Sequence, residues 1–316
     1  MQPPSTTREA AIIGKHRALA IVKSVTEMES KSRSVVITGA SSGIGRATAL
    51  RLARKGWRVF AAVRKESDAA AIAGENIGGL DTVLLDVTDR ESIAGAARNV
   101  RTRLAGRGLD GLVNNAGVGS VSPVEYTPLE KLREIFEINL FGQIATIQAF
   151  LPLIRAAKGR IVNNGSVGDH LTSPFGGALA SSKAAFASMS AALRLELKPQ
   201  GIEVCVIEPG AINTPAVEKT LGGVEKTIAS WPPEGAALYG EAMRQVAHTF
   251  ATKEHAGSPP EAVAEVVERA LTEHHPRTRY PAGKDSVKMT LMARLLPEKI
   301  LDIAVLKTFG LNTHAH

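Results

Sequence analysis

Short apolar runs alternate with longer segments of helical periodicity along most of the chain. The apolar runs suit strands that are buried on both faces, and they cover residues 34–38, 58–63, 81–85, 109–113, 160–163 and 202–207. The segments of helical character lie between them, at 44–55, 66–73, 90–104, 128–157 and 177–198. Strand followed by helix, repeated, predicts an α/β fold built on a doubly wound parallel sheet.

The two ends of the chain depart from this rhythm and suggest the domain organisation. Residues 1–31 are amphipathic with interspersed basic residues, which predicts an N-terminal helical extension. Residues 286–316 are apolar and basic, with Pro297 as a break, which predicts a C-terminal helical tail. We therefore expect one domain over residues 32–285, and peripheral membrane contact through the tail is a further possibility.

Composition narrows the class of protein. With 44% apolar residues in 316, the chain can bury a sizeable core. Its one cysteine, Cys205, excludes a disulfide within the chain and favours a reducing compartment. The sequence contains no run of about 18 apolar residues and no secretory signal pattern, so we expect a cytoplasmic protein without a transmembrane segment.

The net charge of +7 is spread along the chain and is not gathered into a basic tract with interleaved aromatic residues. This distribution argues against nucleic acid as a partner. A general positive field favours anionic ligands, such as a phosphorylated cofactor.

A glycine-rich turn joins the first predicted strand to the first predicted helix. Gly39, Gly43 and Gly45 lie in "TGASSGIG" at residues 38–45. Glycines at this place permit a tight turn, let the backbone approach a pyrophosphate, and leave the N–H groups of the helix free to receive it. The spacing differs from the G-x-G-x-x-G fingerprint, so the turn alone is a moderate signal for a dinucleotide.

Further motifs follow this turn in a fixed order. They are "LDVTD" at 85–89, "NNAG" at 114–117, "INLFG" at 138–142, "GSVGD" at 165–169, Lys183, and "IEPGAINTP" at 207–215. With the glycine turn, they make residues 32–285 resemble the short-chain dehydrogenase/reductase family. The resemblance implies a single Rossmann-type domain that binds NAD(P) and transfers hydride between the nicotinamide and an alcohol or carbonyl.

The resemblance also assigns cofactor-binding positions. It implies that the pyrophosphate loop comprises Gly39, Ser41, Ser42, Gly43, Ile44 and Gly45. The adenine contacts would be Asp86 and Val87, and the strand end beneath the ribose would contain Asn114, Ala116 and Gly117. The nicotinamide and diphosphate segment would be Pro209, Gly210, Ile212 and Thr214.

The end of the second predicted strand bears on cofactor choice. An acidic residue there would hydrogen-bond the ribose 2′-hydroxyl, whereas an arginine binds a 2′-phosphate in a charge-assisted pair. The sequence has Arg64 at this place, so we expect NADP(H) to be favoured over NAD(H).

The catalytic positions of the resemblance are incomplete. Asn139, Ser166 and Lys183 stand where the family has its asparagine, serine and lysine, so Lys183 is also expected to contact the nicotinamide ribose. The family's proton-donating tyrosine would stand four residues before Lys183, and this position is Leu179. Leucine has no proton to donate, and general acid–base catalysis typically contributes about 10² to 10⁴ in rate.

Three explanations for Leu179 remain open. In the first, the tyrosine of an otherwise intact oxidoreductase has been replaced, naturally or by deliberate inactivation. Alternatively, Asp169 or His170, just after Ser166, supplies the proton. In the third, the chain is a nucleotide-binding regulator or partner without redox turnover.

The alternation of predicted strands and helices stops over residues 213–258, where the family has its variable substrate lid. Its apolar residues either line a hydrophobic pocket or close the lid onto the core. Likeness to the hydroxysteroid and retinol dehydrogenase branch implies a lipophilic alcohol or ketone as substrate.

The adjacent histidines His274 and His275 have no partner at metal-ligand spacing, so we expect no metal site.

The helical segments 128–157 and 177–198 each have a face of small residues. These faces resemble the family's dimer interface and imply a homodimer or homotetramer.

Overall fold

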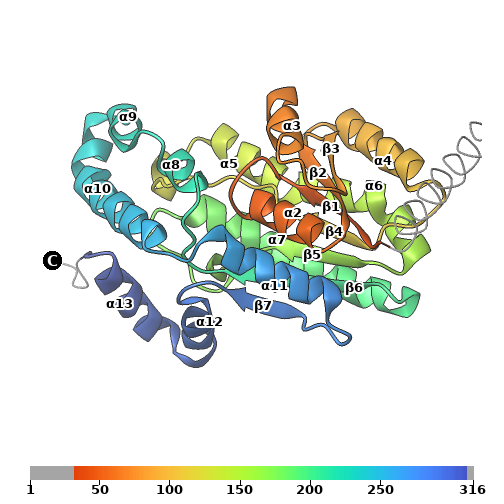
Figure 1. Cartoon of the computed structure of the whole chain (residues 1–316). Coiled ribbons are helices and arrows are strands. Elements are labelled where there is room, and N and C mark those ends of the chain that lie inside the picture. Colours follow the sequence, from red (N-terminus) through yellow and green to blue (C-terminus); the bar gives the residue numbers. More distant parts are fainter. Residues whose placement is uncertain (1–31, 312–316) are drawn as a thin grey trace, which may run out of the picture.

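The computed structural model describes residues 32–311 and has a seven-stranded sheet at its centre (Figure 1). The strands are β1 (Ser34–Thr38), β2 (Arg58–Val63), β3 (Leu80–Leu84), β4 (Gly111–Asn114), β5 (Arg160–Asn164), β6 (Glu203–Pro209) and β7 (Arg279–Ala282). Every neighbouring pair is parallel, and the order across the sheet is β3-β2-β1-β4-β5-β6-β7. The predicted doubly wound α/β fold is confirmed.

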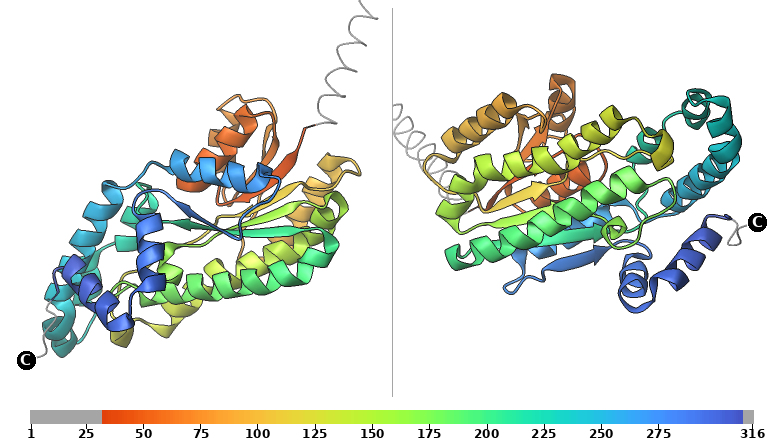
Figure 2. Two further views of the ribbon diagram at one scale, coloured as in Figure 1. Left: turned by 90° about the horizontal axis from the view of Figure 1, so that it is seen from below. Right: turned by 180° about the vertical axis from the view of Figure 1, so that it is seen from behind.

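Helices cover both faces of the sheet (Figure 2). One face packs against α2 (Gly43–Arg54), α3 (Glu66–Ala73) and α11 (Pro260–Thr272), and the other against α4 (Arg90–Leu104), α6 (Gly142–Ala157) and α7 (Gly177–Leu197). Successive side chains of β1 alternate between the two layers, because Val35 and Ile37 join the first cluster and Val36 joins the second. This two-sided burial explains why the strands are continuously apolar in sequence.

Three elements differ from the sequence prediction, and one of them, helix α11, was not among the helical segments expected from the sequence. Strand β7 was not predicted, because its sequence, "RYPA", is short and contains a proline, which is tolerated at a sheet edge. The single helix expected over 128–157 is divided into α5 (Leu129–Phe136), a π-helical turn η2 (Glu137–Phe141) and α6. Such turns occur often at functional sites, and this one carries Asn139.

The continuous helical stretch Leu129–Ala157 is also the one span, among the described residues, that is long and apolar enough to cross a membrane. Its C-terminal part, α6, packs against the sheet through Ile147, Phe150 and Ile154, which are at most 4% exposed. Core helices of globular proteins commonly have this length and composition, so the finding is weak evidence for a membrane span.

The predicted lid region folds into α8 (Ala216–Leu221), α9 (Val224–Ala229) and α10 (Pro233–His255) at one end of the sheet (Figure 1). The tail folds into α12 (Ser286–Leu295) and α13 (Glu298–Thr308), which lie at the same end. A third apolar cluster joins lid and tail, since Phe309 packs with Trp231, Met243 and Val246. The helical extension predicted for residues 1–31 lies outside the described residues.

The lone cysteine, Cys205, is in the middle of β6 and is 1% exposed. Burial raises the pKa of its thiol to about 12, so the thiolate is absent at neutral pH.

Candidate functional site

The glycine turn leads from β1 into the N-terminus of α2. Gly39 and Gly43 have φ of 64° and 54°, in the left-handed region that glycine adopts without strain. A Cβ on Gly45 would lie 2.3 Å from the carbonyl oxygen of Gly39, so only glycine fits there. The helix N-terminus thus presents its first N–H groups beside glycines that leave room for a pyrophosphate.

A buried network of polar side chains fixes the strand ends beneath this turn. The Thr38 hydroxyl accepts hydrogen bonds from the N–H groups of Asn115 and Ala116, at 2.9 and 3.0 Å. The Asn115 amide donates to the carbonyl oxygen of Thr38 and accepts from the Asn164 amide, both at 3.0 Å. These bonds join β1, β4 and β5. Thr38, Asn115 and Asn164 were assigned no role from the sequence, although the first two lie inside quoted motifs and Asn164 directly precedes one.

Lys183 and Asn139 meet beside Gly117, although they are 44 residues apart in the chain. The ammonium of Lys183 donates to the carbonyl oxygen of Asn164 at 2.7 Å. A Cβ placed on Gly117 would lie 3.6 Å from Lys183 Nζ and 3.3 Å from Asn139 Oδ1. Because Gly117 has no Cβ, there is room for these two side chains to lie next to each other at the carboxyl ends of β4 and β5.

The backbone of the next segment holds Asn139 in place. Its Oδ1 accepts from the N–H of Val118, and its Nδ2 donates to the carbonyl oxygen of Val118, both at 2.9 Å. The same Nδ2 lies 3.0 Å from the hydroxyl of Ser182, the residue before Lys183. The π-helical turn η2 is therefore tied both to the segment after β4 and to helix α7.

Burial lowers the pKa of Lys183 to about 8, against an opposing effect of the Asp169 charge. A shift of this size corresponds to roughly 3 kcal/mol that the charged ammonium costs the folded protein. This cost is fully present below pH 8 and disappears as the pH rises toward the lysine's ordinary pKa, because the folded protein releases its proton first. A lysine retained at such a cost is typical of a functional site.

Ser166 and Leu179 stand in the loop after β5 and in the first turn of α7. Ser166 follows β5 by two residues and accepts a hydrogen bond from the Gly168 N–H at 2.9 Å through its hydroxyl. Leu179 lies one turn before Lys183 and is half-buried. Leu179 is thus on the helix face that carries Lys183.

The segment after β6 covers the glycine turn. A Cβ on Gly43 would lie 3.3 Å from the side chain of Thr214. The Ile212 N–H donates to a carboxyl oxygen of Glu254 at 3.0 Å. A Cβ on Gly210 would lie 2.3 Å from the carbonyl oxygen of Lys284, so this position also requires glycine. The structure therefore brings residues 209–214 to the same cleft as the glycine turn and reveals Glu254, which the sequence prediction missed.

Arg64 follows the end of β2 and is exposed. Nearby, burial opposes ionisation of Asp86, but hydrogen bonds from Thr88 and the charge of Arg64 outweigh it and lower the pKa of the carboxyl. Since Arg64 has no hydrogen bond or ion pair with another residue of 32–311, its guanidinium is available to a ligand.

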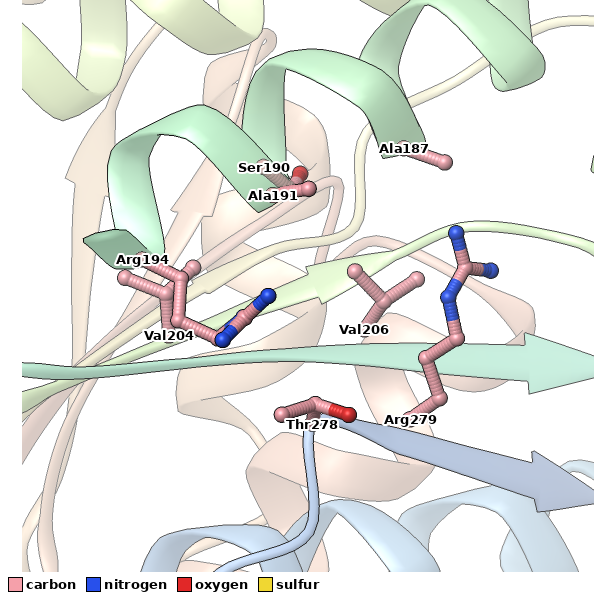
Figure 3. Close-up of a pocket in the computed structure, with 8 residues that line it drawn as sticks. All are labelled: Ala187, Ser190, Ala191, Arg194, Val204, Val206, Thr278 and Arg279. Carbon is pink, nitrogen blue, oxygen red and sulfur yellow. The ribbon is translucent and has the colours of Figure 1, made fainter. Parts of the chain in front are cut away.

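A buried cluster of charges lies behind the Ser166 loop. Arg279 of β7 contacts Asp169 at 2.7 Å, His170 Nε2 at 3.0 Å, and Glu208. His170 Nε2 also lies 2.9 Å from Glu208. Figure 3 shows the side chain of Arg279 rising from β7 toward α7, beside a cavity of about 50 Å³. That volume suits water and not a substrate.

This cluster changes the interpretation of Asp169 and His170. Oxygen and nitrogen atoms of Asp169, His170 and Glu208 lie close enough together to hold a metal ion. The guanidinium of Arg279 already contacts all three, so a cation occupies their centre. Both side chains named as alternative acids are engaged in this ion cluster. Glu208 and Arg279 were not predicted from the sequence, because they are 71 positions apart in the chain.

The lid region is closed by its own aromatic side chains. Tyr126 stacks on Trp231 with ring centroids 5.7 Å apart and meets Tyr239 edge-on at 5.8 Å. Phe175 contacts Tyr239 at 6.1 Å and has a φ of 60°, a strained value for an aromatic residue. These rings belong to the third apolar cluster, which is separate from the two clusters on the faces of the sheet.

Comparisons with known proteins agree with this geometry. The family profile described as "short chain dehydrogenase" matches residues 33–223. The chain is similar to retinol dehydrogenase 5 of Mus musculus, with 36% identity over 281 residues that cover 85% of this chain and 86% of the relative. It is also similar to an NADPH-dependent 3-dehydrocapnine reductase of Ornithobacterium rhinotracheale, with 33% identity over 275 residues, 85% of this chain and 95% of the relative.

Among solved structures, a short-chain dehydrogenase from Streptomyces avermitilis superposes with a TM-score of 0.69 at 28% identity. The match covers 89% of this chain and 96% of that protein. Sequence and fold comparisons therefore lead to the same group of proteins.

Proposed function

Because the chain belongs to the short-chain dehydrogenase/reductase family of oxidoreductases, we propose that it binds NADP(H) and serves hydride transfer to or from a lipophilic alcohol or ketone, with Leu179 altering the proton-transfer step. The observation that carries this proposal is the convergence of Lys183, Asn139 and the glycine turn at the carboxyl ends of β1, β4 and β5. Ligands bind at this edge in open α/β sheets.

The described residues fit a dinucleotide. The glycine turn leaves room for a pyrophosphate at the N-terminus of α2, and a Cβ at Gly45 would close that room. Lys183 has ammonium protons beyond the one given to Asn164, and these can bind ribose hydroxyls. When bound, the nicotinamide supplies the hydride. The protein's part is to orient it with residues 209–214, to stabilise charge with Lys183, and to bind the substrate oxygen with Ser166.

The proton transfer is where this chain departs from its family. Asp169 and His170 both contact Arg279, and an acid engaged in this way must break its contacts before donating a proton. These contacts favour an oxidoreductase whose tyrosine has been replaced over one with a relocated acid. The competing function is a nucleotide-binding regulator of the same fold, for which Leu179 would complete a site that only binds.

We expect Leu179→Tyr to raise NADP(H)-dependent turnover of lipophilic alcohols or ketones by about 10² to 10⁴ over the parent. The new hydroxyl would lie one helical turn from Lys183, whose charge lowers the tyrosine pKa and eases proton exchange. Steady-state kinetics on a panel of such substrates checks this, and Leu195→Tyr, at an exposed site on the same helix, is the control.

Binding measurements separate the two functions. If Leu179→Tyr binds NADPH, judged by fluorescence titration, but gains no turnover on any substrate, the regulator is favoured. If the parent already turns over a ketone and His170→Ala or Asp169→Ala lowers that rate a hundredfold, the relocated acid is correct.

The preference for NADP(H) rests on Arg64, which is exposed at the end of β2. A hydrogen bond between charged groups contributes about 1.5 to 3 kcal/mol, so NADPH should bind at least about tenfold more tightly than NADH. Arg64→Ala should remove this ratio, whereas Arg54→Ala, at an exposed site on α2, should keep it. Calorimetry with both cofactors measures the ratio, and equal affinities in the parent would refute the preference.

A lipid surface is the partner that the tail helices fit. Val287, Leu291 and Leu295 repeat every four residues on α12 and are 67%, 54% and 70% exposed. On α13 the exposed Ile300 and Ile303 continue this apolar surface. Four exposed basic residues accompany these side chains and form no ion pair within the described part of the chain: Lys288, Arg294, Lys299 and Lys307. Aliphatic side chains beside unpaired basic groups favour anionic membranes.

We expect the full chain to sediment with vesicles containing phosphatidylserine and to stay in solution with neutral phosphatidylcholine vesicles. Leu291→Ser combined with Leu295→Ser should lower the bound fraction several-fold. Leu84→Ser, at an exposed position on β3, should leave it unchanged. Equal binding by all three proteins would show that α12 is not the contact.

The proposal includes a cellular setting, expected from the composition, and an oligomeric state, expected from the family resemblance. A reducing, cytoplasmic setting suits the lone, buried Cys205. A homodimer or homotetramer would cover the exposed Phe141 of η2 and Met189 of α7. Light scattering that gives the mass of a single chain would contradict the oligomer.

A further inference from the structure

The loop that carries Ser166 is closed by its own hydrogen bonds. In this loop, residues 166–171, three backbone hydrogen bonds of 3.1 or 3.2 Å join loop residues to one another. The Ser166 hydroxyl also bonds within the loop, because its donor is the Gly168 N–H. Within the described part of the chain, the backbone of this loop therefore makes no hydrogen bond to the sheet.

Two side chains of the loop reach the sheet. Asp169 Oδ2 accepts a hydrogen bond from Arg279 Nη1 at 2.7 Å, and His170 Nε2 lies 3.0 Å from the same nitrogen. His170 Nε2 also lies 2.9 Å from Glu208 Oε1, which contacts Arg279 Nη1 as well. Three of these four contacts share a single nitrogen atom. Arg279 is thus the centre of the polar attachment of the loop to β6 and β7.

The charges in this cluster make the arginine necessary. The carboxylates of Asp169 and Glu208 are 1% and 0% exposed, and oxygen atoms of the two lie within 4.8 Å of each other. Two anions at this separation repel each other, and burial removes the water that would screen them. The guanidinium of Arg279 contacts both carboxylates and supplies the opposite charge. Without it, we expect the loop to move Asp169 away from Glu208 and toward water.

The backbone of Arg279 lies in a paired strand. Arg279 is opposite Val206 in the parallel pairing of β6 and β7, and the Val206 N–H donates to the carbonyl oxygen of Thr278 at 3.0 Å. Figure 3 shows the side chain of Arg279 rising beside Val206 toward α7. The loop is therefore anchored to the sheet through a side chain whose starting point is fixed.

We propose that Arg279 is a positioning residue for Ser166. By neutralising Asp169, three residues after the serine, it holds the loop so that the serine hydroxyl keeps its place relative to Lys183. The inference rests on the proposed function in assigning Ser166 to the substrate oxygen. Arg279 acts through Asp169 and has no part in the chemical step itself.

The cofactor segment is held separately from this loop. Residues 209–214 have backbone hydrogen bonds of their own to the carbonyl oxygens of Ala282 and Ser258, at 2.9 and 3.0 Å. Neither bond involves Arg279. Loss of the guanidinium should therefore displace Ser166 while most cofactor contacts stay in place, so that the rate of reaction falls more than the affinity for NADPH.

Hydrogen exchange of the peptide containing residues 165–171 tests the attachment in the full chain without cofactor. We expect Arg279→Met, which removes the charge at similar length, to speed exchange in this peptide about tenfold or more, with little change in the glycine turn. Arg279→Lys should exchange nearly as the parent does, because one ammonium can replace the single nitrogen that makes the contacts. Arg277→Met, at an exposed position two residues earlier, is the matched control.

Steady-state kinetics then tests the consequence for Ser166 in the Leu179→Tyr protein. In this background the new hydroxyl supplies the proton, so a loss of rate cannot come from removing a relocated acid. Adding Arg279→Met should lower kcat for a ketone about tenfold to a hundredfold, because the substrate oxygen loses its aligned partner, while the KM for NADPH stays close to its value. Adding Arg279→Lys should leave most of the rate in place.

Unchanged exchange of residues 165–171 in Arg279→Met would overturn the proposal. Equally faster exchange in the glycine turn and the strands would also overturn it, since that pattern means a general loss of stability, and so would faster exchange of the loop with an unchanged kcat. If Arg279→Met does not fold, Asp169→Asn removes the charge from the loop while Arg279 keeps Glu208 as its partner, and the same faster exchange is expected. If Leu179→Tyr shows no turnover, the proposed function fails, and the exchange result still decides whether Arg279 holds the loop.

Discussion

The cleft depends on one buried hydrogen bond, from the ammonium of Lys183 to the carbonyl oxygen of Asn164. A flexible lysine has a single position there because Asn164 is itself held through Asn115 to Thr38, so that three strand ends and α7 are fixed together. The charge of Lys183 is expensive to bury, and the surrounding amides provide the polar contacts that make it tolerable. Without this network, the strands would still form a sheet, but their carboxyl ends would not define a site.

The parallel sheet was predictable from the sequence because its strands are buried on both faces and are therefore continuously apolar. The edge strand β7 was not, since an edge tolerates the polar residues and the proline of "RYPA". The candidate site likewise contains residues that could be predicted from the sequence and residues that could not. Lys183, Asn139 and the glycine turn stand in motifs whose spacing is local, whereas Glu208, Arg279 and Glu254 obtain their partners only when distant segments meet. Nothing in their sequence neighbourhoods indicated those partners.

Leu179 places an apolar side chain one helical turn before the buried ammonium of Lys183. The first turn of α7 is regular helix, and the Leu179 carbonyl oxygen accepts a hydrogen bond from the Ser182 hydroxyl. The strained Phe175 lies four residues before Leu179, and its ring meets that of Tyr239, which in turn meets Tyr126. These edge-on contacts join the segment before α7 to helix α10.

The burial of Cys205 has a practical consequence. This thiol is 1% exposed, is un-ionised at neutral pH, and is the chain's single cysteine. Maleimides and other thiol reagents attack the thiolate, so the natural protein should be silent toward them while it is folded. A cysteine introduced on the outer surface of α10 would then be the sole site of labelling, and a fluorophore or spin label there would follow the movement of the lid without any prior substitution in the core.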